Sequence, residues 1–223
     1  GVCMTLLEGE NAAMLVDTGY GIEDVADFMR HMTDLPLTVF LTHNHHDHAM
    51  GARCFPETYM LEADMADWRM FTNDEMRRRV LTQAIGKNLT VDEKTFLAGE
   101  IPLPKVMKPG VIDLGGLTAE IIEAPGHTPG SAVVYVPERK LLLSGDDWNP
   151  CTWLFFPQAL GLREYRSNMR GIQQLPFEKV LCPHREALYD RWMFDDFFNA
   201  LTDGNLRAAE PVNIAPYEQI DTC

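Results

Sequence analysis

The chain has 223 residues, of which 46% are hydrophobic, and this is enough to bury one substantial core. Its 33 acidic residues outnumber its 19 basic ones, which gives a formal charge of -14. A field of this sign repels polyanions, so a nucleic-acid partner is not expected. The densest basic run, Arg77 to Arg79, follows Asp74 and Glu75 and is typical of a solvated helix face. We expect a single domain over residues 1–223.

The cysteines give no sign of a disulfide framework. No two of them form a CxxC pair, and they are widely spaced, as Cys3, Cys54, Cys151, Cys182 and Cys223. This usage suits a reducing cytosol, so a cytoplasmic location is expected. No segment approaches the length of a membrane span, and the first residues do not form a basic region followed by an apolar stretch. No membrane partner is expected, and the oligomeric state is left open.

Hydrophobic patterning predicts the elements in chain order. A hairpin is expected from residues 4–8 and 12–16, followed by a helix over 22–32 and a buried strand at 37–41. Residues 62–98 have the spacing of two amphipathic helices, which we interpret as a helical insertion. The second half is rich in strand signals, and no regular structure is expected after Leu206. In this second half we expect strands at 111–114, 118–123, 132–136, 141–143 and 179–181 and helices near 162–175 and 189–201.

A dense histidine cluster directly follows the strand at 37–41. In an extended segment His43 and His45 point the same way, while Asp47 and His48 can turn back from the start of a following helix. Imidazole nitrogen and carboxylate oxygen suit a borderline ion such as Zn²⁺, and three ligands per ion leave room for water. His46 faces away from His45 and is left out of the predicted ligand set.

Three further candidates lie in later loops. His127 lies in a rigid loop rich in Pro and Gly, and His184 comes immediately after the strand at 179–181. Asp146 ends an apolar strand and can offer one oxygen to each of two metal ions. Together these residues could supply the remaining ligands of a two-metal site.

In these motifs the chain resembles the metallo-β-lactamase fold superfamily of metal-dependent hydrolases, over roughly positions 5 to 200. The motifs are, in order, Asp17, the HxHxDH signature from His43 to His48, His127, Asp146 and His184. The resemblance implies an α/β fold, a four-layer αβ/βα sandwich of two mixed β-sheets flanked by helices. It also implies a first metal ion on His43, His45 and His127, a second on Asp47, His48 and His184, Asp146 as the bridge, and Asp17 in support.

Such a site implies a metal-dependent hydrolase. Two divalent ions, expected to be zinc with iron or manganese as alternatives, would activate a shared water. Asp47 is the best candidate for proton transfer, and Asp17 could orient a histidine ligand.

The aromatic residues after Asp146 admit two interpretations. Trp148, Trp153 and Tyr165 could pack in the core or line a substrate pocket. If they line the pocket, the substrate has an apolar part and Tyr165 could assist an oxyanion. We name all three as candidate pocket residues.

The expected reaction is hydrolysis of a small-molecule ester, thioester or lactone. The segment from Gly126 to Ser131 is similar to a glyoxalase II loop, but few residues follow His184, so that family's glutathione-binding helical segment is not expected. The alternatives are a mononuclear iron enzyme similar to persulfide dioxygenases, a phosphodiesterase and a nonenzymatic binding protein.

Overall fold

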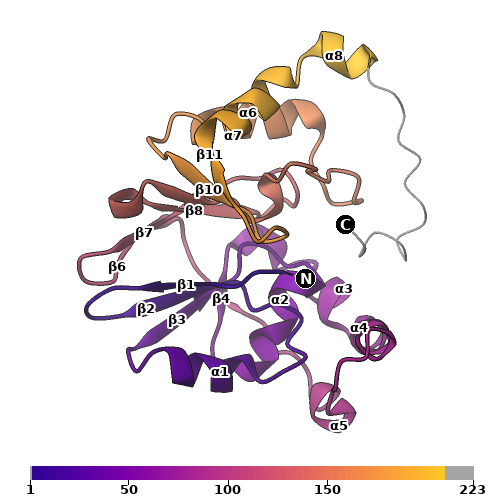
Figure 1. Cartoon of the computed structure of the whole chain (residues 1–223). Helices are drawn as coiled ribbons and strands as arrows, with labels where there is room; N and C mark the ends of the chain where they lie inside the picture. Colours follow the sequence, from indigo (N-terminus) through magenta and orange to yellow (C-terminus); the bar gives the residue numbers. More distant parts are fainter. Residues whose placement is uncertain (1, 209–223) are drawn as a thin grey trace.

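The structure, a computed structural model, describes residues 2–208 of the chain. Two sheets lie face to face between outer layers of helices (Figure 1). This arrangement confirms the predicted four-layer sandwich of two mixed sheets. That residues 1–223 form one domain stays a prediction, and residue 1 and residues 209–223 lie outside the described residues.

The first sheet has five strands in sequence order. The predicted hairpin is antiparallel, and the later strands add to it in parallel. The two strands that the sequence did not indicate are only two residues long. The order is β1 (Thr5–Glu8), β2 (Ala13–Val16), β3 (Leu37–Phe40), β4 (Tyr59–Met60) and β5 (Lys105–Val106).

The second sheet has six strands and is also mixed. Neighbouring strands are antiparallel, except that β9 and β10 run parallel to each other. Its spatial order is β11 (Leu188–Asp190), β10 (Lys179–Leu181), β9 (Leu141–Leu143), β8 (Ala132–Val136), β7 (Thr118–Glu123) and β6 (Gly110–Asp113). Five of these strands were predicted, and β11 was not.

Strand β8 shows why the middle of the second sheet is hydrophobic on both faces. Successive side chains on a strand point to opposite faces. Val134 and Val136 therefore pack between the two sheets, whereas Val133 and Tyr135 pack against the outer helices. Burial on both faces makes the strand an unbroken apolar run rather than an alternating one.

The helices cover the outer faces of the sheets (Figure 1). Helix α1 packs on the outer face of the first sheet, and α6 and α7 pack on that of the second. Among the described helices, none combines the length and apolarity needed to cross a bilayer. The helices are α1 (Val25–Met32), α2 (His46–Ala49), α3 (Trp68–Thr72), α4 (Asp74–Gly86), α5 (Glu93–Phe96), α6 (Leu162–Ile172), α7 (Arg191–Ala200) and α8 (Asp203–Ala208).

The segment 62–98 is helical, as expected, but divides into more than two helices. It holds α3, α4 and α5, and Asn73 caps α4 by accepting the backbone N–H of Met76 at 2.9 Å. Helix α8 extends to Ala208, so the expected irregular tail begins no earlier than that residue.

The expectation of a solvated face for the three arginines of α4 is wrong for two of them. Arg77 is 1% exposed and donates a hydrogen bond of 2.6 Å to the carbonyl of Gly99 and another to that of Phe96. Arg79 is half-buried, and only Arg78 is exposed. Successive helix residues point about 100° apart, so a run of three cannot share one face.

The predicted site residues all follow strands that run in one direction within their sheet. Strands β2 and β3 are parallel, and so are β9 and β10. Strand β7 runs the same way as β9 because both are antiparallel to β8. The carboxyl ends of these strands therefore line one edge of the sandwich, where open α/β folds build their sites.

Candidate metal centre

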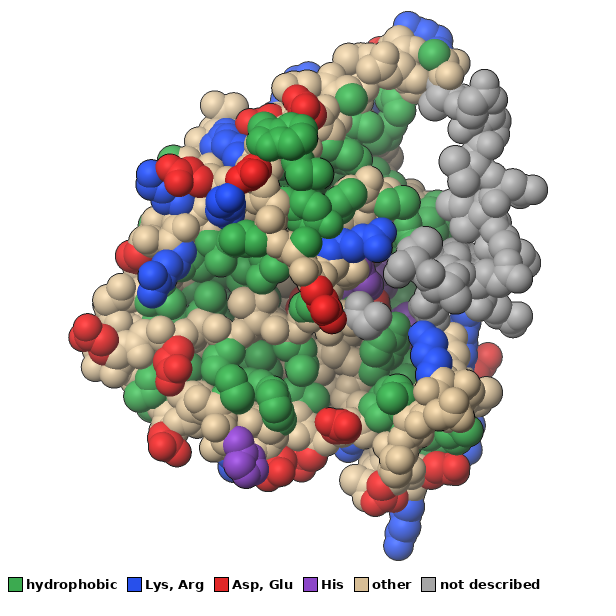
Figure 2. Space-filling view, in the orientation of Figure 1, with side chains coloured by type: hydrophobic (Ala, Val, Ile, Leu, Met, Phe, Trp, Pro, Cys, Tyr) green, Lys and Arg blue, Asp and Glu red, His purple; other side chains and the backbone are tan. Residues whose placement is uncertain are grey.

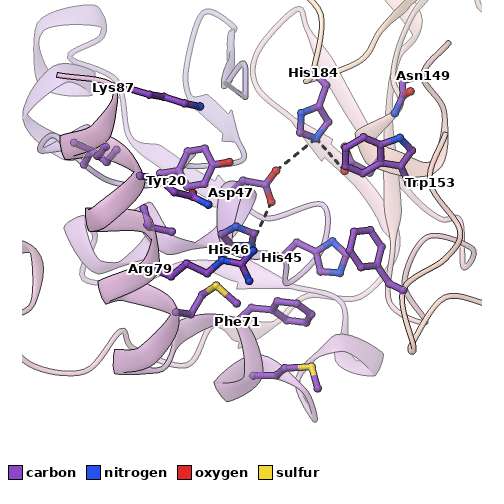
Figure 3. Close-up of a pocket in the computed structure, with 18 of the residues that line it drawn as sticks. Tyr20, His45, His46, Asp47, Phe71, Arg79, Lys87, Asn149, Trp153 and His184 are labelled. Carbon is purple, nitrogen blue, oxygen red and sulfur yellow. Dashed lines mark hydrogen bonds and ion pairs between the residues drawn. The ribbon is translucent and has the colours of Figure 1, made fainter. Parts of the chain in front are cut away.

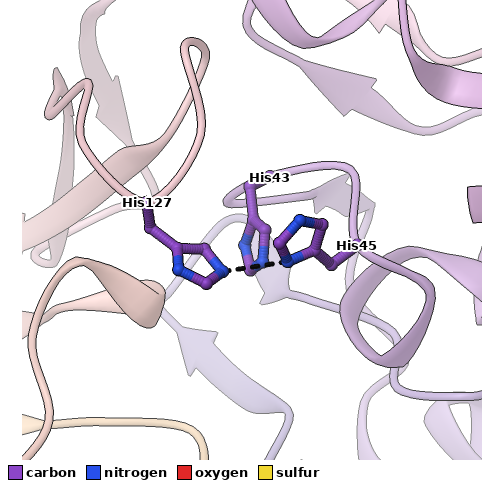
Figure 4. A group of neighbouring side chains, drawn as sticks. All are labelled: His43, His45 and His127. Carbon is purple, nitrogen blue, oxygen red and sulfur yellow. Dashed lines mark hydrogen bonds between the residues drawn. The ribbon is translucent and has the colours of Figure 1, made fainter. Parts of the chain in front are cut away.

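Three histidines from two loops meet at this edge (Figure 4). His43 and His45 follow β3, and His127 follows β7. The Nδ1 atom of His45 lies 2.9 Å from Nε2 of His127, and the ring of His43 lies 4.9 Å from that of His127. All three are buried, and one nitrogen of each lies within 4.8 Å of the other two. The sequence placed these residues together, and the structure does the same.

A second group lies beside the first. Nε2 of His48 is 3.3 Å from Oδ1 of Asp146, and Nε2 of His184 is 3.1 Å from Oδ2 of the same carboxylate. Asp47 completes the group, with Oδ2 3.5 Å from Nε2 of His184. Asp146 also reaches the first group, since its Oδ2 lies 3.4 Å from Nε2 of His127. All seven predicted ligands thus lie around one point of the fold.

The outer nitrogens of two histidines are held by groups that can only accept a hydrogen bond. Nδ1 of His127 lies 2.7 Å from the carbonyl oxygen of Trp153, and Nδ1 of His48 lies 2.8 Å from Oδ2 of Asp17. An acceptor at Nδ1 requires the proton there, which leaves Nε2 as a free lone pair in the neutral ring. Both Nε2 atoms point into the cluster.

His45 is turned the other way. Its Nδ1 faces the cluster, and its Nε2 lies 2.8 Å from the side-chain amide of Gln158. If Nε2 carries the proton, it donates to the amide oxygen of Gln158, which a half-turn of the amide brings into place. His43 has the hydroxyl of Thr42 at 3.1 Å from its Nδ1. Gln158 was missed in the sequence because 113 positions separate it from its partner.

Buried atoms without partners show that the residues fit a metal ion. Within residues 2–208, Nε2 of His43, Nε2 of His48 and Oδ1 of Asp146 are buried and have no hydrogen-bond partner. Leaving such atoms unpaired is costly, and buried polar atoms in native proteins are nearly always satisfied. All three are good ligands for divalent ions, so the two groups can hold metal ions.

The electrostatics of the cluster divide its histidines into two kinds. Burial lowers the pKa of His43 and of His45 well below the usual range, so both rings are neutral. Burial also opposes a charge on His48, but the carboxylates of Asp146 and Asp17 outweigh it and hold the pKa of His48 well above the usual range. The cluster therefore has neutral nitrogen ligands at His43 and His45, and around His48 its carboxylates favour a positive charge.

Asp17 is positioned by an unusual backbone. Its φ is 63°, a left-handed conformation that few residues other than glycine adopt. In this conformation its carboxylate accepts the backbone N–H of Thr42 at 2.7 Å and reaches His48 at 2.8 Å. The strain is consistent with the supporting role predicted for Asp17.

The structure adds Asp64, which the sequence did not single out. Its carboxylate accepts the backbone N–H of Asn44 at 3.1 Å, the hydroxyl of Thr128 at 2.8 Å and the backbone N–H of Gly130 at 2.6 Å. Asn44 lies between two predicted ligands, and Thr128 directly follows a third. One buried side chain therefore ties both loops of the three-histidine group together. Burial raises the pKa of Asp64 to about 6.

A cavity of about 630 Å³ opens beside the cluster. Its wall includes residues of α3 and α4 on one side and residues of the loop after Asp146 on the other, and His45, His46, Asp47 and His184 also line it (Figure 3). His46 lies on this wall with its ring 5.6 Å from that of Tyr20, outside the three groups of potential ligands. The apolar part of the wall includes Ile22, Met70, Phe71, Met76, Val80, Ala84, Trp153 and Phe156.

Of the three candidate pocket residues, only Trp153 lines this cavity. The expectation for Trp148 and Tyr165 is wrong, because both are buried in the core between the second sheet and the outer helices. Trp148 packs its ring 5.6 Å from Phe194, and the Tyr165 hydroxyl donates to the carbonyl of Asp147. Tyr165 therefore cannot assist an oxyanion in the cavity.

The metallo-beta-lactamase superfamily model matches residues 2–184. The chain belongs to this superfamily. Residues 2–184 contain all seven predicted ligands, and the prediction of a hydrolase is confirmed at the level of the superfamily.

Individual relatives are more distant. An acyl-coenzyme A thioesterase, MBLAC2 of Gallus gallus, is 26% identical over 202 residues, which are 80% of this chain and 70% of that protein. A linear primary-alkylsulfatase of a Pseudomonas species is 23% identical over 173 residues, 63% of this chain but only 32% of that protein. A metallo-beta-lactamase structure from Pontibacter korlensis has a TM-score of 0.63 at 16% identity, covering 91% of this chain and 87% of its own. The structural likeness shows the shared fold alone.

Proposed function

We propose that the chain is a dinuclear metal-dependent hydrolase that cleaves a small-molecule thioester, ester or lactone. His43, His45 and His127 would hold one divalent ion, and Asp47, His48 and His184 the other, with Asp146 between them. We propose zinc as the metal, because a shell of imidazole and carboxylate ligands suits it.

The observation that carries this proposal is the convergence of unpaired ligand atoms from two sheets. Buried lone pairs on His43, His48 and Asp146 face one another, and none of the three atoms has a hydrogen-bond partner among the described residues. Divalent ions bound there would supply the Lewis acidity that lowers the pKa of water and polarises a carbonyl.

The chain's own residues prepare the reaction. Asp47 lines the cavity with its carboxylate directed toward His184, where it can take a proton from an attacking water. The Trp153 carbonyl and the Asp17 carboxylate fix the orientation of His127 and His48 before substrate arrives. Preorganised groups of this kind cost no rearrangement when charge develops.

The cavity wall supports a substrate with an apolar portion. Phe71 and Phe156 lie with their ring centroids 4.5 Å and 4.8 Å from the ring of His45, and Met76 and Val80 extend the wall along α4. An acyl chain can pack against such a surface and bring its carbonyl to the cluster. The likeness to a protein named as an acyl-coenzyme A thioesterase favours the thioester among the three substrate classes.

A substrate panel tests the proposal. Purified protein, reconstituted with zinc, manganese or iron, is assayed with matched thioesters, carboxylic esters, lactones and phosphodiesters. We expect hydrolysis of the first class to be strongest, with chelator abolishing it and His45→Ala lowering kcat/KM by about 10³-fold or more. His31→Ala, an exposed histidine on α1, is the matched control. Turnover that survives both chelation and His45→Ala would contradict the proposal.

A further inference from the structure

The lining of the cavity has the opposite charge balance from the chain as a whole. Acidic residues outnumber basic ones by 33 to 19 over the full sequence. Among the described residues lining the cavity, however, the only carboxylates are the predicted ligands Asp47 and Asp146. Three cations lie on the same wall, namely Arg79, Lys87 and Arg185.

These cations lie on opposite sides of the cavity. Arg79 lies on α4, Lys87 directly follows that helix, and Lys87 lies across from His184 in Figure 3. Arg185 directly follows His184 and lines the same space. In the space-filling view, Lys or Arg side chains lie near the place where histidine is visible, and an acidic side chain lies beside it as well (Figure 2).

The three cations are also available to a ligand. Within the described part of the chain, none of the ion pairs includes Arg79, Lys87 or Arg185. Arg77, by contrast, donates hydrogen bonds to Asp74 and to backbone carbonyls and does not line the cavity. Two arginines of α4 therefore differ in their surroundings: Arg77 is buried in the fold, and Arg79, two positions later, lines the cavity.

We propose that Arg79, Lys87 and Arg185 form an anion subsite that binds the phosphate groups of a thioester substrate. This assignment rests on the proposed thioester hydrolysis at the metal centre. The cavity is thus lined by three kinds of residue: the ligand cluster, apolar side chains such as Phe71, Met76 and Val80, and the cations. A thioester whose thiol part carries phosphates has a matching part for each, because cations bind phosphate oxygens strongly and an acyl chain packs on apolar side chains.

Two matched thioesters separate the role of charge from that of the acyl chain. One is a medium-chain acyl-coenzyme A, and the other is the same acyl group on N-acetylcysteamine, which has the same thioester and no phosphate. We expect the ratio of their kcat/KM values to favour the coenzyme A thioester. In the double variant Arg79→Gln/Lys87→Gln this ratio should fall by about tenfold, since charge pairs near a surface each contribute modestly. Added salt should lower the same ratio in the wild type.

Binding of free coenzyme A, measured by calorimetry on the metal-loaded protein, is the second readout. The double variant should bind it about tenfold more weakly, and Arg185→Gln several-fold more weakly. Arg79→Lys, which keeps the charge, should restore most of the affinity. The matched control is Arg78→Gln, an exposed arginine of the same helix outside the cavity, and it should leave both readouts within about twofold.

The outcomes distinguish this subsite from the proposed function. If the protein hydrolyses both thioesters and the double variant leaves the ratio and the coenzyme A affinity unchanged, the subsite is wrong and the hydrolase proposal stands. If neither thioester is hydrolysed but coenzyme A affinity falls with the charges, the hydrolase proposal fails and the anion subsite stands. Thermal unfolding of each variant shows that the fold is retained.

Discussion

Asp17 and His48 are joined by a contact of 2.8 Å between Oδ2 and Nδ1, although 31 positions separate them in the chain. The carboxylate fixes the ring so that Nε2 faces Asp146 at 3.3 Å. This contact links the residue that follows β2 to helix α2. Asp17 therefore orients a residue of the ligand cluster although Asp17 itself does not line the cavity.

Asp17→Asn tests that support. Asparagine adopts left-handed backbone conformations more readily than most residues, so the turn at φ 63° is kept while the charge is lost. We expect metal affinity, measured by competition with a chelator, to fall by about 10- to 100-fold. Asp27→Asn, which removes an exposed carboxylate on α1, should leave affinity unchanged. Equal affinities for the two variants would show that Asp17 has no part in holding His48.

The buried carboxylate of Asp64 predicts a pH dependence of stability. Its folded pKa of about 6 lies above the ordinary 3.8, so the folded state binds the proton more tightly than the unfolded state. Protonation of Asp64 therefore adds to the free energy of unfolding. This stabilisation is fully present below pH 3.8 and is lost as the pH rises through about 6. In metal-free protein, the free energy of unfolding of the wild type should fall relative to Asp64→Asn over this interval by about 3 kcal/mol at most.

Denaturant unfolding at several pH values measures this difference, and the histidine titrations shared by both proteins cancel in the comparison. Asp34→Asn, which removes an exposed carboxylate that is not among the charges acting on Asp64, should follow the wild type at every pH. Parallel curves for wild type and Asp64→Asn would mean that the pKa of Asp64 is not raised in the folded state.

Gly130 lies where a side chain cannot fit. A Cβ atom there would come within 2.5 Å of the backbone nitrogen of Asp64. Gly130→Ala should therefore push apart the loop after His127 and the Asp64 segment, lowering stability by about 1–3 kcal/mol and weakening metal binding. Gly171→Ala, on helix α6 with open space around it, should be neutral or slightly stabilising. Similar melting temperatures for both variants would contradict the close approach.

Gln158 should set the orientation of His45. Gln158→Met keeps the length of the side chain but removes the partner at 2.8 Å from Nε2. With the ring free to turn, we expect metal affinity to fall by about tenfold and kcat to fall with it at subsaturating metal. Gln174→Met, exposed at the end of α6, is the control. If excess metal fails to restore kcat in Gln158→Met, the residue acts on substrate and not through His45.

The ligands could be predicted from the sequence because each follows a strand and belongs to a short local motif. Of the residues that contact these candidate ligands or their loops from outside the cluster, Asp17 was predicted, but Gln158 and Asp64 could not be. Gln158 and Asp64 reach their partners across 113 and up to 66 positions, and nothing in their own neighbourhoods marks them. The strands β4 and β5 are too short to leave a periodic pattern, so they too were missed.

The positions of Trp148 and Trp153 could not be predicted from the sequence either. Trp148 and Trp153 lie five positions apart and are equally apolar, yet one is in the core and the other on the cavity wall. Which of the two side chains is buried in the core depends on the path that the loop after Asp146 takes over the second sheet. Local composition carries no information about that turn.

The central claim is that two metal ions, held by both ligand groups, are needed for hydrolysis. Its most direct test is a metal titration of the chelator-treated protein, with bound metal measured by elemental analysis and thioester hydrolysis followed at each step. We predict two ions per chain, with activity rising as the second position fills and lost in His184→Ala. One bound iron per chain with oxygen uptake in place of hydrolysis would contradict the account.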